Sequence, residues 1–156
     1  MKSCKRLRGG LAVLLLGASA ACGGGGSSTG SSPSAPSSTP MNIAGTWKGT
    51  ASDSTGPGDI TLTITQSDAS VSGTATFNLT GTPVTGRGTL SGSVSGSTLH
   101  VTISIPAGGF DAPYTTCTAT MNTDGQIGSG SITATYSGTN SCGGPISSGT
   151  MTLSKS

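Results

Sequence analysis

The chain has 156 residues, contains no Glu, and only 8% of its residues are charged. Four of its seven Lys and Arg lie within positions 2–8, so three cations and five Asp remain beyond them, which is a net charge of −2. Because a basic surface is what draws a protein to nucleic acid, this balance excludes nucleic-acid binding as a function.

The first 22 residues have the order of a secretory signal. Basic residues at positions 2–8 precede an apolar stretch from Leu11 to Ala21, which has 11 residues, whereas a membrane-spanning helix needs about 20. The stretch ends at Cys22, and this arrangement resembles a bacterial lipoprotein signal, with Ser19 where Leu is usual. The resemblance implies removal of residues 1–21, acylation of Cys22 and attachment to a membrane through the acyl chains.

The residue after Cys22 indicates the membrane to which the protein is expected to go. Gly23 stands there, and an Asp at that place in such signals directs retention at the inner membrane, so we expect the outer membrane or the cell surface. The alternative is ordinary cleavage after Ala21, which would release a soluble secreted protein.

The next segment, 22–41, is expected to be the lipidated cysteine and a linker. From position 23 to 40 it contains only Gly, Ser, Thr, Pro and Ala. Such a composition cannot bury enough apolar surface to offset the entropy of ordering. We therefore expect a flexible tether that precedes one folded domain, 42–156.

Apolar and small polar residues alternate with period two throughout 42–156, which indicates β-strands. Turn-forming residues divide the segment into eight expected strands: 43–51, 58–67, 70–79, 84–95, 98–105, 114–122, 127–137 and 147–154. Asp124-Gly125 is expected to form a two-residue hairpin turn. The short connections favour an all-β fold, an eight-stranded antiparallel up-and-down barrel, with a β-sandwich as the alternative.

The two faces of these strands differ in composition. The face expected to point outward is rich in Thr and Ser, which favours a water-soluble barrel over a membrane pore. The inward face carries six glycines, which leaves either a cavity or a flattened barrel. A cavity lined by Phe77, Leu90 and Val101 would favour ligand binding.

The first strand contains Gly45-Thr46-Trp47, a G-x-W motif. In an eight-stranded meander this motif resembles the calycin superfamily, the lipocalins and avidin-like proteins. The resemblance implies a barrel in which Trp47 lies near the closed end and a late basic residue, here Lys155, packs across it. Because Trp47 is the sole tryptophan, the tryptophan set that avidins use for biotin is absent, and we expect Trp47 to fill the core rather than to contact a ligand.

Four cysteines are present, but Cys4 leaves with the signal and Cys22 takes the lipid. Cys117 and Cys142 remain, and in an oxidising compartment we expect a disulfide between them, with two free thiols as the alternative. There is no C-x-x-C motif and His100 is the only histidine, so we expect no metal site and no cofactor.

Residues for catalysis are scarce in 42–156. The five Asp are scattered, mostly near turns, and His100 points outward by alternation with no acid or nucleophile next to it in the sequence. We therefore expect a protein that is not an enzyme.

The longest connection, 106–114, carries two aromatic residues and an acid. Loops at a barrel mouth are where ligands enter, which makes Phe110, Asp111 and Tyr114 the candidate ligand-binding residues. The alternative is that Phe110 and Tyr114 cap the core beneath the loop.

Together these features predict a lipid-anchored, extracytoplasmic β-barrel lipoprotein of the cell envelope. Its expected function is to bind a small apolar ligand or an envelope protein partner. The alternatives are a structural or surface lipoprotein without a ligand, and a calycin-like protease inhibitor whose N-terminal segment enters an enzyme.

Overall fold

The computed structural model describes residues 38–156. The expected signal peptide, Cys22 and most of the expected linker lie outside the described residues. Within the described part, no helix is long and apolar enough to cross a membrane.

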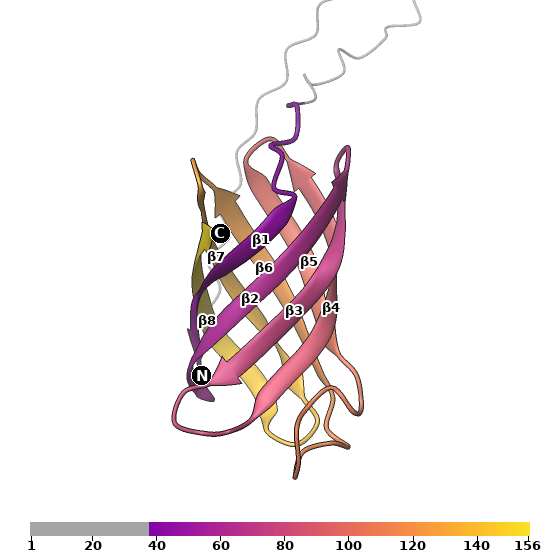
Figure 1. The fold of residues 1–156 in the computed structure, drawn as a ribbon, viewed down its shortest axis with the longest axis vertical. Coiled ribbons are helices and arrows are strands. Elements are labelled where there is room, and N and C mark those ends of the chain that lie inside the picture. The colour runs from indigo at the N-terminus through magenta and orange to yellow at the C-terminus, as the bar shows by residue number, and fades with distance from the viewer. Residues whose placement is uncertain (1–37) are drawn as a thin grey trace, which may run out of the picture. The chain divides into compact units, whose positions relative to one another are not determined.

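The described chain forms eight β-strands and no helix (Figure 1). The strands are β1 (Gly45–Asp53), β2 (Gly56–Ser67), β3 (Ser70–Leu79), β4 (Thr85–Ser95), β5 (Thr98–Ile105), β6 (Ala119–Ile127), β7 (Ser131–Asn140) and β8 (Gly144–Lys155). Each strand pairs antiparallel with the next, and β8 pairs with β1 to close the barrel. The expected all-β meander barrel is confirmed, and the β-sandwich alternative is wrong. The architecture is consistent with a calycin-like fold.

Alternation along every strand sends apolar side chains inward, where they form one core. The largest fully buried side chains are Trp47, Ile43, Ile60, Leu62, Leu99, Ile103, Ile132, Leu153 and Val94. Leu90 and Val101, expected beside a cavity, are buried in this core.

One end of the barrel is plugged by the segment that leads into β1. The Ile43 side chain is fully buried, and its carbonyl oxygen accepts a hydrogen bond of 2.8 Å from the Trp47 indole nitrogen. The Gln66 side chain accepts from the Ile43 amide and donates to the Met41 carbonyl oxygen, which ties the segment to β2. In Figure 1 this segment, in indigo, lies at the end opposite the long β5–β6 loop.

The structure brings together the three residues of the expected barrel-closing motif at this plugged end. Lys155 stands opposite Trp47 in the β1–β8 register, and its ammonium nitrogen lies 5.6 Å from the centroid of the Trp47 ring. Gly45 has a φ of 126°, and a side chain there would meet the Lys155 Cε at 3.2 Å. A cation over an indole face at such a distance contributes roughly 0.5–1 kcal/mol where it is exposed.

Inward glycines let neighbouring strands approach closely. A Cβ at Gly73 would overlap the carbonyl oxygen of Thr63, and a Cβ at Gly49 would overlap that of Thr152. The missing side chains at these positions therefore permit strand bending and do not leave empty space.

The expected boundaries of several strands are wrong, most clearly that of the sixth. It was expected at 114–122 with a turn at Asp124-Gly125, but both residues lie inside β6. Every second residue of β6, from Ala119 to Ile127, is buried, and this alternation outweighs the local turn preference. The turn falls at 128–130, where the Gly128 amide donates to the Ser131 carbonyl oxygen. As a result β7 and β8 also depart from their expected ranges.

Candidate binding cavity

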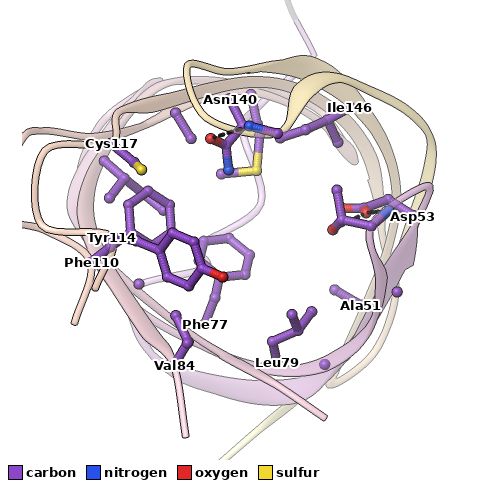
Figure 2. Close-up of a pocket in the computed structure, with 18 of the residues that line it drawn as sticks. Ala51, Asp53, Phe77, Leu79, Val84, Phe110, Tyr114, Cys117, Asn140 and Ile146 are labelled. Atoms are coloured by element: carbon purple, nitrogen blue, oxygen red, sulfur yellow. Dashed lines mark hydrogen bonds between the residues drawn. The ribbon is translucent and has the colours of Figure 1, made fainter. Parts of the chain in front are cut away.

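A cavity of about 400 Å³ occupies the end of the barrel opposite the plug. It lies among the β1–β2 and β3–β4 hairpins, the β5–β6 loop and the β7–β8 turn, and Figure 2 shows its lining side chains around the inside of the barrel. Most of the lining is apolar: Ala51, Phe77, Leu79, Val84, Ile105, Phe110, Ala119, Met121 and Ile146. Its size falls within the range of about 300–1,000 Å³ that small-molecule sites occupy.

Three of the four aromatic side chains that line the cavity, all but Tyr136, lie together on one side of it. Phe77 comes from β3, whereas Phe110 and Tyr114 come from the β5–β6 loop (Figure 2). Phe110 also packs against the core, whereas Tyr114 is 47% exposed and is not among the residues packed against the core. The alternative that both residues cap the core therefore holds only in part, for Phe110.

A glycine makes room for Phe110. Gly86 of β4 forms a β-bridge with Phe110, and a Cβ at Gly86 would lie 2.8 Å from a carbon of the Phe110 ring. Any larger residue at position 86 would push the ring aside, so this glycine shapes the aromatic side of the cavity.

The structure does not place Asp111, the third candidate residue, in the cavity lining. Its carboxylate accepts a hydrogen bond of 2.7 Å from Arg87 and one of 3.2 Å from the Thr85 amide. The hydrogen bond from Arg87 and its positive charge hold the pKa of the Asp111 carboxyl below its usual value. Asp111 therefore fastens the β5–β6 loop to β4 and positions its neighbour Phe110.

A polar pair, Asp53 and Tyr136, lies on the cavity lining, and the sequence analysis missed it. The Tyr136 hydroxyl donates a hydrogen bond of 2.8 Å to Asp53 Oδ2, joining the end of β1 to β7. Burial of the Tyr136 hydroxyl raises its pKa, and the hydrogen bond to Asp53 raises it further, so the hydroxyl keeps its proton to a higher pH than an ordinary tyrosine does. Alternation offered a signal for Asp53, which shares the inward register of Trp47 and Ala51.

The Tyr136 ring also depends on a glycine. A Cβ at Gly149 of β8 would lie 2.6 Å from two carbons of that ring. Between Tyr136 and Gly138 the β7–β8 register shifts, and nearby Ser148 has a φ of 56°. The missing side chain at Gly149, within this irregular stretch of β8, thus leaves space for the Tyr136 ring.

The expected disulfide between Cys117 and Cys142 is confirmed, with the two Cα atoms 5.6 Å apart. It joins the end of the β5–β6 loop to the β7–β8 turn, and both cysteines line the cavity. Asn140 reinforces that turn by accepting hydrogen bonds from the Cys142 and Gly143 amides. Two connections at the mouth of the cavity are thereby held together covalently.

Two charged residues border the cavity, and both are acidic: Asp53 in the inward register of β1, and Asp59, which is exposed in the outward register of β2. The cations of the described part lie elsewhere: Arg87 pairs with Asp111, Lys155 lies over Trp47, and Lys48 is exposed on the outer face of β1. The cavity therefore presents apolar surface together with negative charge.

His100 lies on the outer wall, away from the cavity. The pairing of β5 with β6 brings it next to an acid, Asp124, which is 24 residues away in the sequence. The His100 Nδ1 lies 2.6 Å from Asp124 Oδ1 across the β5–β6 pair, and the two side chains are 57% and 70% exposed. Ser93 stands opposite His100 in the β4–β5 register, but among the described residues no hydrogen bond joins the two. Residues 38–156 hold no cluster of three or more His, Cys, Asp or Glu that could bind a metal.

No protein-family model, no curated protein and no solved structure matches this chain significantly. What the site can do is therefore argued from its geometry. An apolar cavity whose lining also carries the Asp53–Tyr136 hydrogen bond can hold a ligand of matching shape.

Proposed function

We propose that this protein is a lipid-anchored binding protein of the cell envelope that holds a small apolar ligand in the open end of its barrel. The observation that carries the proposal is the cavity of about 400 Å³ with its apolar and aromatic lining. Burying apolar ligand surface contributes about 25 cal/mol per Å² to the binding free energy. Because the cavity already exists in the fold, little free energy is lost in ordering its side chains when a ligand binds.

The anchor part of the proposal rests on the sequence. The basic head, short apolar stretch and Cys22 support acylation, and the outer membrane or the cell surface is the proposed location. The described chain reaches β1 at the plugged end, so attachment through that end leaves the cavity mouth free. The G-x-W motif and Lys155 support a relationship to calycins.

Binding in the cavity stands ahead of the other functions considered. A purely structural lipoprotein has no need of an open apolar cavity, whose lining lacks the contacts of a packed core. A protease inhibitor would need a free N-terminal segment, and the Met41–Ile43 part of that segment is held to the barrel. The Met41 amide donates to the Gly96 carbonyl oxygen, and Ile43 is buried. The cavity lining supports binding, and we propose no enzymatic step.

The proposal is tested by filling the cavity. Ala51 points into it from β1, and the adjacent Ser52 is exposed on the outer face. We expect a neutral naphthylamine fluorophore to bind the wild-type protein, Ala51→Phe to weaken that binding at least tenfold, and Ser52→Phe to leave it unchanged. Fluorescence titration measures the affinities, and circular dichroism checks that both variants keep their sheet.

Two results would count against the proposal. If the fluorophore failed to bind the wild-type protein, the cavity would not be an apolar binding site. If the two variants bound it equally well, the fluorophore would be lodging elsewhere.

A further inference from the structure

We propose that the ligand of this cavity is an amine, with an apolar body and a protonated amino group seated at Asp53. This inference deepens the proposed binding function and rests on it. Three features of the cavity carry it: an unfilled acceptor position on Asp53, the sign of the charges on the lining, and the aromatic side facing Asp53.

The hydrogen-bonding capacity of Asp53 is only partly used. Its Oδ1 accepts from the Thr55 amide and from the Thr55 hydroxyl, each at 2.6 Å, and its Oδ2 accepts from Tyr136 at 2.8 Å. A carboxylate offers about four lone-pair positions, so one position remains, on Oδ2. Since Tyr136 Oη already lies at Oδ2 and both residues line the cavity, that position is within reach of a bound ligand.

Asp53 also stabilises the turn after β1, and it does so with a different carboxylate oxygen from the one proposed to bind the ligand. Its bonds to Thr55 are those of a turn-stabilising Asp, and they use Oδ1 alone. The turn does not require Oδ2, which is held instead by a tyrosine 83 residues away in the sequence. The Tyr136 hydroxyl therefore holds Asp53 Oδ2 at the cavity, independently of the turn.

The charges on the lining select the sign of the ligand. Asp53 lies in the inward register of β1, whereas Asp59 borders the cavity from the exposed, outward register of β2. Across residues 38–156 no Lys, Arg or His lines the cavity. A carboxylate or phosphate ligand would meet like charge without a counter-ion, which opposes binding, whereas an ammonium group would meet a partly buried carboxylate.

The aromatic side fits the apolar part of the same ligand. Figure 2 shows Phe110 and Tyr114 across the cavity from Asp53. Aromatic rings pack well against an apolar body. A ligand with its amino group at Asp53 would lay its apolar part toward these rings.

The test compares three probes that share one ten-carbon chain: decylamine, decanol and decanoate. Each is titrated by calorimetry at neutral pH, below its micelle concentration, into the wild-type protein and two variants. Asp53→Asn keeps the shape and an acceptor for the Thr55 turn but removes the charge. Asp68→Asn is the matched control, because Asp68 lies outside the cavity lining and Asn tolerates its φ of 53°.

We expect one decylamine per wild-type barrel, bound at least tenfold more tightly than decanol, with decanoate weaker still. Asp53→Asn is expected to weaken decylamine binding about tenfold or more and to leave decanol unchanged, whereas Asp68→Asn changes neither. Added salt is expected to weaken decylamine binding but not decanol binding, a comparison that needs only the wild-type protein.

The failures are distinguishable. Equal affinities for the three probes, a preference for decanoate, or equal losses in the two variants would overturn the amine inference and leave apolar binding standing. If none of the three probes bound, the proposed binding function itself would fail, and the inference with it.

Discussion

Tyr136 and Asp53 are the residues whose chemistry depends most on the closure of the barrel. They belong to strands that are distant in the sequence, and their hydrogen bond of 2.8 Å forms because β8 lies between β7 and β1 in the closed sheet. The Tyr136 hydroxyl is desolvated and donates to a carboxylate, so its protonated form is favoured in the folded protein.

The first prediction follows from this raised pKa. Because the pKa of Tyr136 is higher in the folded than in the unfolded protein, its contribution to stability is complete below the usual tyrosine value of 10.0 and is lost as the pH rises above it. At neutral pH, Tyr136→Phe should lower the free energy of unfolding by about 1 kcal/mol through the lost hydrogen bond. Above pH 10.0, the difference between wild type and variant should shrink.

Urea denaturation at several pH values measures both effects. Tyr114→Phe is the control, since Tyr114 is 47% exposed and its hydroxyl makes no hydrogen bond in residues 38–156. A Tyr136→Phe difference that stayed constant up to high pH would show that the hydroxyl is not held protonated by the fold.

At the scale of the elements, three contacts, among others, hold the β5–β6 loop to β4 and to the β7–β8 turn. Arg87 binds Asp111, the Arg87 amide donates to the Gly109 carbonyl oxygen at 2.7 Å, and Cys117 is bonded to Cys142 of the β7–β8 turn. Since this loop carries Phe110 and Tyr114, its attachments determine the shape of the cavity mouth. The disulfide is the only one of the three that a reductant can remove.

The second prediction concerns that disulfide. Its cysteines are 25 residues apart, and closing a loop of that length in the unfolded chain stabilises the fold by about 3.5 kcal/mol on the chain-entropy account. We expect the Cys117→Ser, Cys142→Ser double variant to lose about that much stability and to bind the naphthylamine fluorophore more weakly. Reductant should reproduce both losses in the wild-type protein and have no effect on the double variant.

The strands and their order could be predicted because alternation is a local signal. Ile60, Leu62 and Ile64 show it without reference to any partner, and they lie in β2 as expected. The turn after β6 could not be predicted so well, because Asp124-Gly125 favours a turn locally and only its two neighbouring strands hold it extended. The Asp53–Tyr136 pair was out of reach for a similar reason, since it needs the register of the closed barrel.

At the scale of the whole molecule, a binding domain and an anchor have separate requirements. The barrel needs apolar alternation and close strand contacts, which residues 38–156 supply. The proposed anchor needs a signal, a cysteine and a tether, and the segments expected to supply them precede the barrel in the sequence. The two can therefore be tested independently, and the loss of one should leave the other intact.

The last prediction tests the anchor in the full chain, expressed in a bacterium that processes lipoproteins. Cys22→Ala removes the only cysteine that the lipoprotein signal offers for acylation, whereas Cys4→Ala removes a cysteine within the segment expected to be cleaved. We expect most of the wild-type protein and of the Cys4→Ala variant in the membrane fraction and labelled by an alkyne fatty acid. The Cys22→Ala variant should carry no label and fail to reach the membrane as a mature anchored protein. Unlabelled wild-type protein in the growth medium would instead support cleavage after Ala21 and a secreted barrel, in which case the cavity would serve a soluble carrier.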